Sequence, residues 1–563
     1  MQRSPPNKNG RAIGFLNCGL FRWPDIVGGQ FIHPNPQFCW IGVASLYDRV
    51  HHVVPMALTV KTWIDGYIAD IDYLRQYLPE LNPLWPRLVM LKAGLTPPDV
   101  TTACELGFGQ GVSVAMHAAA SPTQWYGTDA NSSHVSFADG LAAASRTDVR
   151  LYNESFAEFA NRTDLPAFDF IAAHGVWSWI SDRNRKVIVD FVQQRLKPGG
   201  LFYLSYDALP GCTPFIALRQ LLFEHAQGSS VDRELFERMD MAVAFADRLL
   251  ATQPDHTRGN SAAIESYQAF KQRDRRATAH EFFNRHWDPM HFATVGRLLV
   301  PVGLSWACSA APLDSIDALK LSPRQQALVE EQEDPIFRQT VRDFILNTGF
   351  RREYWVKGAT RLSGSDRAVA LRRERVVLAG RHSALPLKMR AVLELTKVGP
   401  REAVCRRMLE TLSDHEAWTL GEIEKTIDAG HVDLEEIIQA ALVLAGCGLI
   451  VAAQDDETSA EVRPRTDRLN DHLLDRARTG DSIDTLASPV VGGGVKLKRL
   501  KQLFLLSRRN GAKDPEAWAK EAWDILSREA QPAPPEETLA DLIRQAHAFA
   551  DQDLPALKAL QVA

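Results

Sequence analysis

Residues 101–119, TTACELGFGQGVSVAMHAA, contain three glycines at alternate positions, Gly107, Gly109 and Gly111. The mostly apolar run before them is typical of a buried strand, and the run of small residues after them is typical of a helix. Glycine has no side chain to keep a ligand away, so such a turn brings backbone N–H groups and a helix N-terminus up to a ligand. The stretch therefore predicts a strand, a tight ligand-binding turn and a helix.

Strand-like and helix-like runs alternate after this turn. The further strand candidates are QWYGTD (124–129), VRLYN (149–153), FDFIAAHG (168–175) and GLFYLSYD (200–207). Strands that alternate with helices form a mostly parallel sheet, and ligands gather at the carboxyl ends of its strands. We therefore expect an α/β core with its site at that edge.

The rest of the chain divides by its pattern. Before the core, TVKTWIDGYIADIDYLRQYLPELN (59–82) has helical amphipathic spacing, and LWPRLVMLKAGLTPP (84–98) reads as a helix stopped by two prolines. Residues after 213 read as almost wholly helical, and two helices with a following apolar strand within 419–453 resemble a winged helix-turn-helix. The expected division is a loose extension (1–45), the core with its N-terminal helices (46–212), a helical domain (213–378), a winged-helix-like domain (379–465) and a helical tail (466–563).

Composition narrows the class of protein. The 563 residues carry 64 basic and 69 acidic side chains, a formal charge of -5, which supplies no global basic field for nucleic acid. The seven cysteines are scattered, without a CxxC pair or a His/Cys cluster at metal-ligand spacing. No apolar run reaches the roughly 18 residues of a membrane span, and the first ten residues lack the apolar core of a signal peptide. We expect a cytoplasmic protein with reduced thiols and no membrane span.

The spacing of the three glycines differs from that of a dinucleotide-binding site. A dinucleotide site has the pattern GxGxxG and an acidic residue about 20 positions later. Here the spacing is GxGxG, Glu105 stands two residues before the first glycine, and the second strand candidate ends at Asp129. A carboxylate accepts two hydrogen bonds from a vicinal diol, so Asp129 is the candidate ribose ligand.

The run from Glu105 to Gly111 resembles the first motif, E/D-x-G-x-G-x-G, of the class I S-adenosylmethionine-dependent methyltransferases. The resemblance implies a Rossmann-like seven-stranded α/β core followed by α-helical and winged-helix-like domains, and S-adenosyl-L-methionine as the cofactor. This cofactor has a sulfonium and an ammonium in place of a pyrophosphate, so a nearby carboxylate attracts it. The residues that the resemblance assigns to cofactor binding are Glu105, Gly107, Phe108, Gly109, Gly111, Asp129 at the ribose, Glu154 and Ser155 beside the adenine, His174 and Tyr67.

The resemblance extends beyond the core. HGVWSWI (174–180), SYDALPG (205–211), AHEFFNRHWDPMHF (279–292), REYWVKGA (352–359) and LASPVVGGG (486–494) occur in the order found in bacterial methyltransferases that carry a methyltransferase regulatory domain. Among these, the chain is similar to the rickettsial protein lysine methyltransferases. The resemblance implies a protein substrate, with homodimerisation as a further possibility.

Methyl transfer from a sulfonium is an in-line displacement that needs positioning and a nucleophile with a free lone pair. The candidate catalytic residues are His174, Tyr206 and Trp177, at or just after strand ends. His174 is interpreted as an orienting residue in preference to a general base. Trp177 is either a catalytic residue or a core-packing residue. Tyr67, on the expected helix over 59–82, either packs on the sheet or contacts the cofactor.

Two other patterns are interpreted as structural. The expected recognition helix, DLEEIIQAALVLAGCG (433–448), is acidic at its start and apolar after it, so it packs and does not read bases; nucleic acid is not an expected partner. His280, His286 and His291 are interleaved with aromatic residues and lack the HExxH spacing, so no metal is expected.

The function expected from the sequence is N-methylation of a protein amine such as lysine. The alternatives are a small-molecule or glycolipid methyltransferase, and a non-catalytic regulator or adaptor that binds the cofactor. An intact glycine turn with Glu105 and Asp129 favours cofactor binding but does not distinguish among these three.

Overall fold

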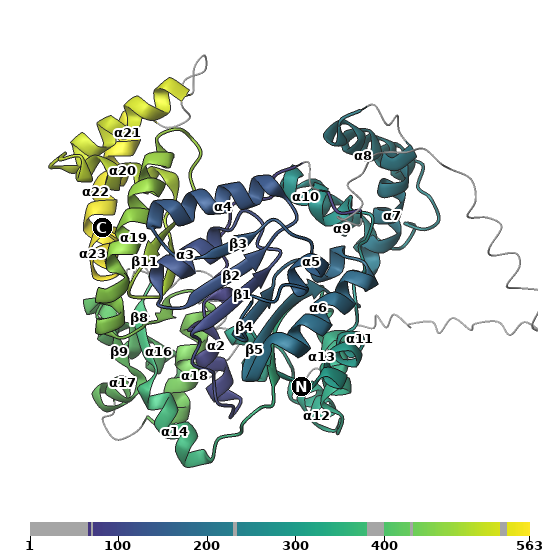
Figure 1. Cartoon of the computed structure of the whole chain (residues 1–563), viewed down its shortest axis with the longest axis horizontal. Coiled ribbons are helices and arrows are strands. Elements are labelled where there is room, and N and C mark those ends of the chain that lie inside the picture. Colours follow the sequence, from purple (N-terminus) through teal and green to yellow (C-terminus); the bar gives the residue numbers. More distant parts are fainter. Residues whose placement is uncertain (1–65, 69–70, 229–232, 380–398, 428–431, 530–537) are drawn as a thin grey trace, which may run out of the picture. The chain divides into compact units, whose positions relative to one another are not determined.

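The computed structural model describes residues 66–68, 71–228, 233–379, 399–427, 432–529 and 538–563, and the sheet at its centre has seven strands (Figure 1). The strands are β1 (Thr102–Leu106), β2 (Gln124–Thr128), β3 (Arg150–Tyr152), β4 (Phe168–Ala173), β5 (Leu196–Asp207), β6 (Leu304–Ser309) and β7 (Phe350–Lys357). Their order is β3-β2-β1-β4-β5-β7-β6, with β1 to β5 parallel and β7 antiparallel to both of its neighbours.

Side chains of the strands alternate between two buried layers, as the two-residue period of a strand requires. Phe170 and Tyr203 lie in the layer that also holds Val114 and Ala138, on the helices after β1 and β2. Ile171 and Phe202 lie in the opposite layer. The helices that follow the first four strands are α3 (Val112–Ala120), α4 (Ser132–Ser145), α5 (Phe156–Ala160) and α6 (Asp182–Arg195), with the short η3 (Trp177–Trp179) before α6. Because both faces are covered, the strands read as nearly continuous apolar runs.

The five strands expected from the sequence occur in the expected order along the chain, and the expected seven-stranded α/β core is confirmed. The expectation of an almost wholly helical segment over 213–378 is wrong in one respect, because β6 and β7 belong to this segment and complete the central sheet. Strand β7 pairs with β5, which lies about 150 positions earlier in the chain, and β6 pairs with β7. A pattern read locally does not show such a pairing.

The remaining elements of that segment are helices, apart from the strand β8 (Arg375–Leu378) at its end. They are α7 (Thr213–Gly228), α8 (Leu235–Ala251), α9 (Ser261–Lys271), α10 (Arg275–Phe282), α11 (Phe292–Leu299), α12 (Pro323–Glu330), α13 (Pro335–Leu346) and α14 (Gly364–Arg373), with the short η4 (Val300–Val302), η5 (Pro312–Ser315) and η6 (Asp317–Leu319). Helices α7 to α10 have a buried cluster of their own, which includes Phe215 and Tyr267. Figure 1 shows these four helices beside the carboxyl ends of the first strands.

The segment before the core differs from its prediction. The described residues 66–68 and 71–78, called the strap below, form no helix, and only the short η2 (Pro79–Leu81) follows them. Backbone groups of the strap bond to side chains elsewhere: the N–H of Tyr73 donates to His134 Nε2 (3.0 Å) and that of Leu78 to Ser113 Oγ (2.9 Å). The predicted helix over 59–82 is therefore wrong for the described part, since tertiary contacts outweigh the local amphipathic pattern. The second predicted helix is present as α2 (Trp85–Lys92).

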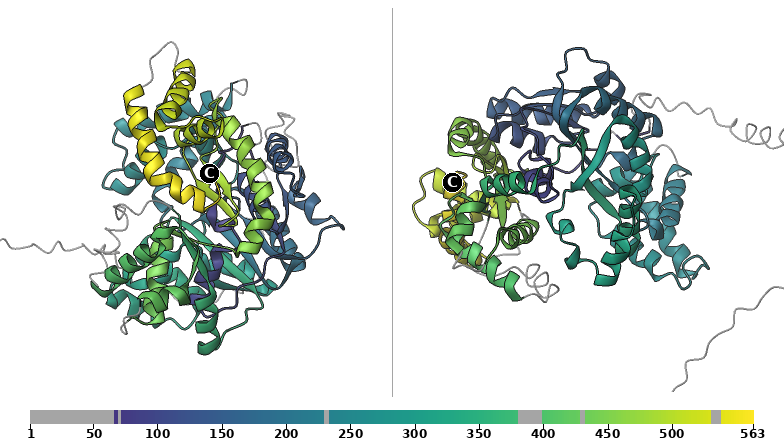
Figure 2. Two further views of the ribbon diagram at one scale, coloured as in Figure 1. Left: turned by 90° about the vertical axis from the view of Figure 1, so that its left-hand side faces the viewer. Right: turned by 90° about the horizontal axis from the view of Figure 1, so that it is seen from below.

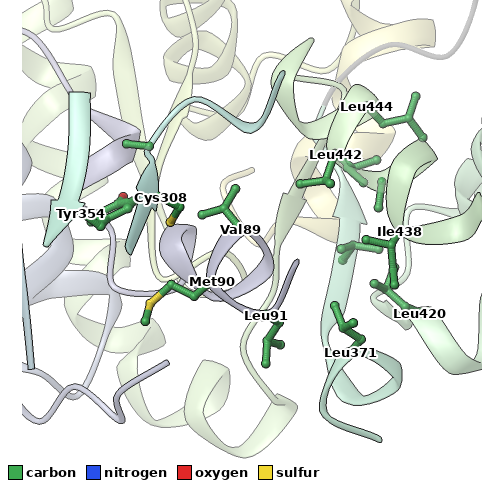
Figure 3. Packing of buried hydrophobic residues seen from close by; sticks show 14 of the residues in the cluster. Val89, Met90, Leu91, Cys308, Tyr354, Leu371, Leu420, Ile438, Leu442 and Leu444 are labelled. Atoms are coloured by element: carbon green, nitrogen blue, oxygen red, sulfur yellow. The ribbon is translucent and has the colours of Figure 1, made fainter. Parts of the chain in front are cut away.

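Helix α2 joins the sheet to the region expected to be winged-helix-like. In Figure 3 the side chain of Val89 stands between Cys308 of β6 and Leu442 of α18, all in one buried cluster. That region has the elements β8 (Arg375–Leu378), α16 (Gly399–Thr411), η7 (Leu412–Asp414), β9 (Trp418–Thr419), α17 (Leu420–Ile427), α18 (Leu434–Gly446) and β10 (Ile450–Ala452).

The small sheet of this region has the order β10-β8-β9, so its middle strand precedes the helices in the chain. Among the described residues, β10 leads into the long α19 (Asp456–Ala477) without the hairpin that would form a wing. Helix α18 is buried along most of its length, which agrees with its interpretation as a packing helix. The winged-helix assignment stays a prediction.

The C-terminal elements pack on the core through a glycine-rich hairpin. They are β11 (Thr485–Ser488), β12 (Gly493–Lys496), α20 (Arg499–Arg509), α21 (Pro515–Glu529), α22 (Leu539–Ala548), η8 (Phe549–Asp553) and α23 (Leu554–Ala559), and Figure 2 shows the last helices, in yellow, as one group. A Cβ on Gly493 would lie 2.3 Å from Tyr77 Oη and 2.9 Å from Asn82 Nδ2. The glycines of LASPVVGGG therefore allow close contact between this hairpin and the end of the strap.

We expect Gly493→Ala to lower the free energy of unfolding by about 1–3 kcal/mol, the usual cost of overpacking a filled site. Urea denaturation followed by circular dichroism measures this loss. The matched control is Gly140→Ala in α4, where an added Cβ meets nothing within 4 Å. That change is expected to stabilise the protein by about 0.5–1 kcal/mol, because alanine favours the helix. Equal effects at the two positions would contradict the close packing.

No helix in the described parts of the chain combines the length and the apolar character that a membrane span needs.

Candidate active site

The turn after β1 has a backbone that only glycine adopts easily. Gly107, Gly109 and Gly111 have φ angles of +73°, +56° and +68°. A Cβ on Gly107 would lie 2.7 Å from Val176 Cγ2, and one on Gly111 would lie 2.4 Å from the Cβ of Ala138. At Gly109 the nearest atom, in Tyr73, is 3.7 Å away. The outer two glycines are thus required by packing, whereas Gly109 borders the open space of a pocket.

Asp129 follows β2 and is tied to this turn. Its Oδ2 accepts a hydrogen bond from the N–H of Gly109 (2.8 Å), and its Oδ1 accepts one from the N–H of Asn131 (2.9 Å). Oδ1 also lies 3.1 Å from His134 Nδ1. Since His134 Nε2 accepts from the N–H of Tyr73, its Nδ1 is the nitrogen that carries the proton and donates to Asp129. The carboxylate is held in one orientation at the mouth of the glycine turn.

Glu105, at the end of β1, is buried and not fully satisfied. Its side chain is 2% exposed, and its Oε2 has no hydrogen-bond partner. Burial, with a smaller effect of Asp129, raises the pKa of Glu105 to about 8. A buried carboxylate without its full set of partners is costly, and a cationic ligand that donates hydrogen bonds would relieve that cost.

A cavity opens beside the turn, and a second cavity adjoins it at Glu105. The first is lined by Tyr67, Tyr73, Gly107, Gly109, Asp129, Ala130, Glu154, Ser155, Phe156, His174, Gly175, Val176, Trp179, Ile180 and Asn184. Both cavities share Tyr73, Gly107, Gly109 and His174, and Phe108 and Gly111 line the second. Within these described linings there is acidic and aromatic character but no Lys or Arg. The pocket therefore favours a cation over a pyrophosphate.

Glu154 and Ser155 follow β3 at the far end of the first cavity. Glu154 Oε1 bonds to Arg162 (2.7 Å), and its buried Oε2 has no partner. Ser155 caps α5: its Oγ accepts from the N–H of Glu158 (3.2 Å), and its own N–H donates to Glu158 Oε2 (2.8 Å). The cap fixes the turn that forms this wall of the pocket.

His174, just after β4, lines both cavities. Its Nδ1 lies 2.9 Å from the hydroxyl of Tyr203, and the two rings are stacked. Burial, with a smaller effect of Arg352, lowers the pKa of His174 to about 3. A ring that stays neutral at such low pH is a weak base, which favours the orienting role over that of a general base.

Two of the candidate catalytic residues do not line either cavity, and here the expectation is corrected. Tyr206 is 1% exposed, in the buried layer with Phe202, and its hydroxyl lies 3.5 Å from Glu353 Oε2. Trp177 is fully buried in the same layer. Successive strand side chains point to opposite faces, so Tyr203 reaches His174 and Tyr206, three residues later, does not.

The structure brings the predicted cofactor residues together, including Tyr67, and adds others. Tyr73, Asn184 and Trp179 line the first cavity, and Tyr67 and Tyr73 come from the strap. Tyr73 lies in the stretch 59–82, whose amphipathic pattern predicts a helix when it is interpreted locally. Asn184, in the first turn of α6, carried no signal. Among the described residues, no group of three or more His, Cys, Asp or Glu side chains could hold a metal ion.

The chain is similar in sequence to a family model and to two bacterial proteins. A family model described as a predicted methyltransferase regulatory domain matches residues 274–357. The uncharacterized protein sll1526 of Synechocystis sp. is 32% identical over 475 residues, which cover 84% of this chain and 92% of that protein. The uncharacterized protein RP028 of Rickettsia prowazekii is 26% identical over 167 residues, 29% of this chain and 66% of that protein.

Among solved structures, PKMT2 from Rickettsia typhi, determined in complex with AdoHcy, is similar with a TM-score of 0.62. It is 14% identical, and the match covers 87% of this chain and 99% of that one. A second structure of PKMT2 has a TM-score of 0.61. The likeness therefore extends over the core, the helical segment and the tail as one fold.

Proposed function

We propose that this chain, which belongs to the same family as the uncharacterized protein sll1526, is a class I S-adenosylmethionine-dependent methyltransferase with a methyltransferase regulatory domain, and that it N-methylates a protein substrate on an amine such as lysine. The observation that carries the proposal is the pair of adjoining cavities beside the glycine turn, with Asp129 in the lining of the first and the unsatisfied Glu105 in the lining of the second.

The residues present fit the cofactor. Asp129 would accept hydrogen bonds from the ribose hydroxyls, and Glu105 would face the ammonium of the methionine end. Glu154 and the capped turn at Ser155 would border the adenine. Tyr67, Tyr73 and Trp179 would present aromatic faces, which attract a sulfonium. When bound, the cofactor supplies an electrophilic methyl group.

The acceptor amine attacks with its lone pair, so it must lose its proton before the N–C bond forms and the S–C bond breaks. Burial in an apolar pocket favours the neutral amine. We propose that His174 positions this amine through Nε2, the ring nitrogen not bonded to Tyr203. The proton leaves to solvent, since His174 is too weak a base to hold it.

A protein substrate is supported by the likeness to PKMT2 over nearly the whole of that chain. A small molecule or a glycolipid as the acceptor, or cofactor binding without transfer, would be revealed by the experiment below. A homodimer remains a proposal that light scattering of the purified chain would test.

The test is transfer of radiolabelled methyl from S-adenosylmethionine by the purified full chain into fractionated cell extract. Label in a protein band that Asp129→Ala and Gly109→Arg abolish is the expected result, and analysis of the labelled residue identifies the amine. Label only in small molecules or lipid would contradict the protein substrate. Cofactor binding without label in any fraction would contradict catalysis.

Replacement of Glu105 by glutamine is expected to stabilise the ligand-free protein and to weaken ligand binding. Without ligand, the Glu105 carboxyl has a pKa of about 8 in the folded chain and an ordinary value of 4.5 when unfolded. The folded state therefore binds the proton more tightly, and the free energy of unfolding falls as pH rises from about 4.5 to about 8. Glu105→Gln removes this loss and is expected to stabilise the ligand-free protein more at pH 8 than at pH 5 in urea denaturation.

The same variant is expected to weaken AdoHcy binding about tenfold, because the attraction between a carboxylate and the ammonium is lost. Calorimetry measures this affinity. Tighter binding by Glu105→Gln would contradict the assignment of Glu105 to the ammonium.

A further inference from the structure

The segment AHEFFNR, at the end of α10, holds the strap by several contacts. His280 Nε2 lies 2.7 Å from the carbonyl oxygen of Ile71, and Glu281 Oε1 accepts from the hydroxyl of Tyr73 (3.2 Å). The N–H of Ile68 donates to Asn284 Oδ1 (2.9 Å). At the start of the strap, a Cβ on Gly66 would lie 2.7 Å from the Cβ of Arg285, so the two chains are in close contact.

The hydrogen bonds of His280 determine which of its nitrogens carries the proton. A carbonyl oxygen only accepts, so Nε2–H donates to Ile71. Nδ1 of the neutral ring then accepts from the hydroxyl of Tyr67, 3.1 Å away. Burial lowers the pKa of His280 to about 4, which keeps the ring neutral near neutral pH. Both ring nitrogens of His280 therefore bond to the strap, Nδ1 to Tyr67 and Nε2 to Ile71.

The strap in turn contacts the site at three points. Tyr67 and Tyr73 line the pocket. The N–H of Tyr73 bonds to His134 Nε2, and His134 Nδ1–H bonds to Asp129. A chain of hydrogen bonds and pocket walls thus connects α10, within the segment matched by the regulatory-domain model, to the carboxylate at the mouth of the pocket.

We propose that His280 is a positioning residue for the cofactor: it clasps the strap so that Tyr67 and Tyr73 cover the pocket and His134 orients Asp129. This inference rests on the proposed function. The described strap has no helix or strand of its own, and its backbone bonds to side chains 61 and 209 positions away. His280 itself lines neither cavity, so it acts on the ligand through the strap.

The test compares the full chain with His280→Ala, His280→Gln and Tyr67→Phe. Glutamine can still donate to Ile71 through its amide and accept from Tyr67 through its carbonyl, whereas alanine can do neither. The matched control is Tyr267→Phe, which removes hydrogen bonds to Val243 and Asp247 inside the same helix group without a recorded contact to the strap. The readouts are AdoHcy affinity by calorimetry and hydrogen exchange of the Ile68 and Tyr73 amides without ligand.

We expect His280→Ala to weaken AdoHcy binding about tenfold and to speed exchange of both amides, with His280→Gln within about threefold of the unaltered chain and Tyr267→Phe unchanged. Tyr67→Phe removes the hydroxyl that bonds to His280 and is expected to weaken AdoHcy binding about threefold to tenfold. This variant tests the positioning role of His280 if His280→Ala does not fold.

Unchanged AdoHcy affinity and unchanged amide exchange in His280→Ala would overturn the positioning role of His280. Equal weakening of AdoHcy binding in His280→Ala and His280→Gln would also overturn it, because the hydrogen bonds of His280 would then not matter. If His280→Ala does not fold, unchanged affinity in Tyr67→Phe would overturn it. Failure of the unaltered chain to bind AdoHcy would instead contradict the proposed function. Amide exchange without ligand would still show whether His280 holds the strap in place.

Discussion

Asp129→Ala is expected to weaken AdoHcy binding by at least about 100-fold. Hydrogen bonds to a charged group contribute about 1.5–3 kcal/mol each, and the ribose would make two with this carboxylate. The variant also removes the acceptor of the Gly109 and Asn131 N–H groups and of His134, so the glycine turn loses its anchor. Two losses of about 1.4 kcal/mol already amount to a factor of 100. Calorimetry with the purified chain measures the change.

The matched control is Asp148→Ala, an exposed carboxylate shortly before β3 whose ion pair with Arg150 spans 3.9 Å. It is expected to leave the affinity unchanged. Asp129→Asn should fall between the two, because an amide still accepts one hydrogen bond but has no charge. If Asp129→Ala bound AdoHcy as well as the unaltered chain, the ribose assignment would be wrong.

The second large effect concerns the buried ionic cluster formed by residues of β7 and α13. Arg351 is 8% exposed, and its guanidinium bonds to Asp343 Oδ1 (2.5 Å), to Glu353 and to Gln339 Oε1 (3.1 Å). Removing a partner from a buried ion pair leaves uncompensated charge and costs about 3–5 kcal/mol. We expect Arg351→Met to lower the free energy of unfolding by about this amount in urea denaturation.

The loss in Arg351→Met is expected to depend on pH. Burial raises the pKa of Glu353 to about 7 even though Arg351 lowers it, and without Arg351 the pKa would rise further. The folded state then holds a proton that the unfolded state has lost, so stability falls as pH rises above 4.5. The variant should therefore lose less stability at pH 5 than at pH 8.

Lys186→Met, which breaks an exposed pair with Asp190, is the control and is expected to cost less than about 0.5 kcal/mol. A similarly small cost for Arg351→Met would contradict an energetic role of the cluster. The cluster contains Glu353, whose Oε2 lies 3.5 Å from the hydroxyl of Tyr206.

Much of the cofactor end of the site could be predicted from the sequence. The run from Glu105 to Gly111 and the aspartate after the next strand are within 25 residues of each other, and a strand, a turn and a helix form from neighbouring residues. The parallel arrangement of β1 to β5 was expected from the alternation of strands and helices. Glu154, two residues after β3, was assigned by the resemblance to the class I methyltransferases.

The acceptor side was harder to predict. Tyr206 and Tyr203 are equally plausible from the sequence, and only the register of β5 between β4 and β7 shows that Tyr203 faces His174. The pairing of β5 with β7 joins residues about 150 positions apart, and no local period reveals it.

By itself the sequence determined the glycine turn, its acidic partners and the parallel core, because these depend on backbone conformations and periodicities within short stretches. Only the tertiary structure decided that the described strap has no helix, that β6 and β7 complete the sheet and that His280 contacts the strap. The physical reason is the distance along the chain: backbone groups of the strap bond to side chains 35 to 216 positions away, and those bonds replace the helix that its own pattern favours.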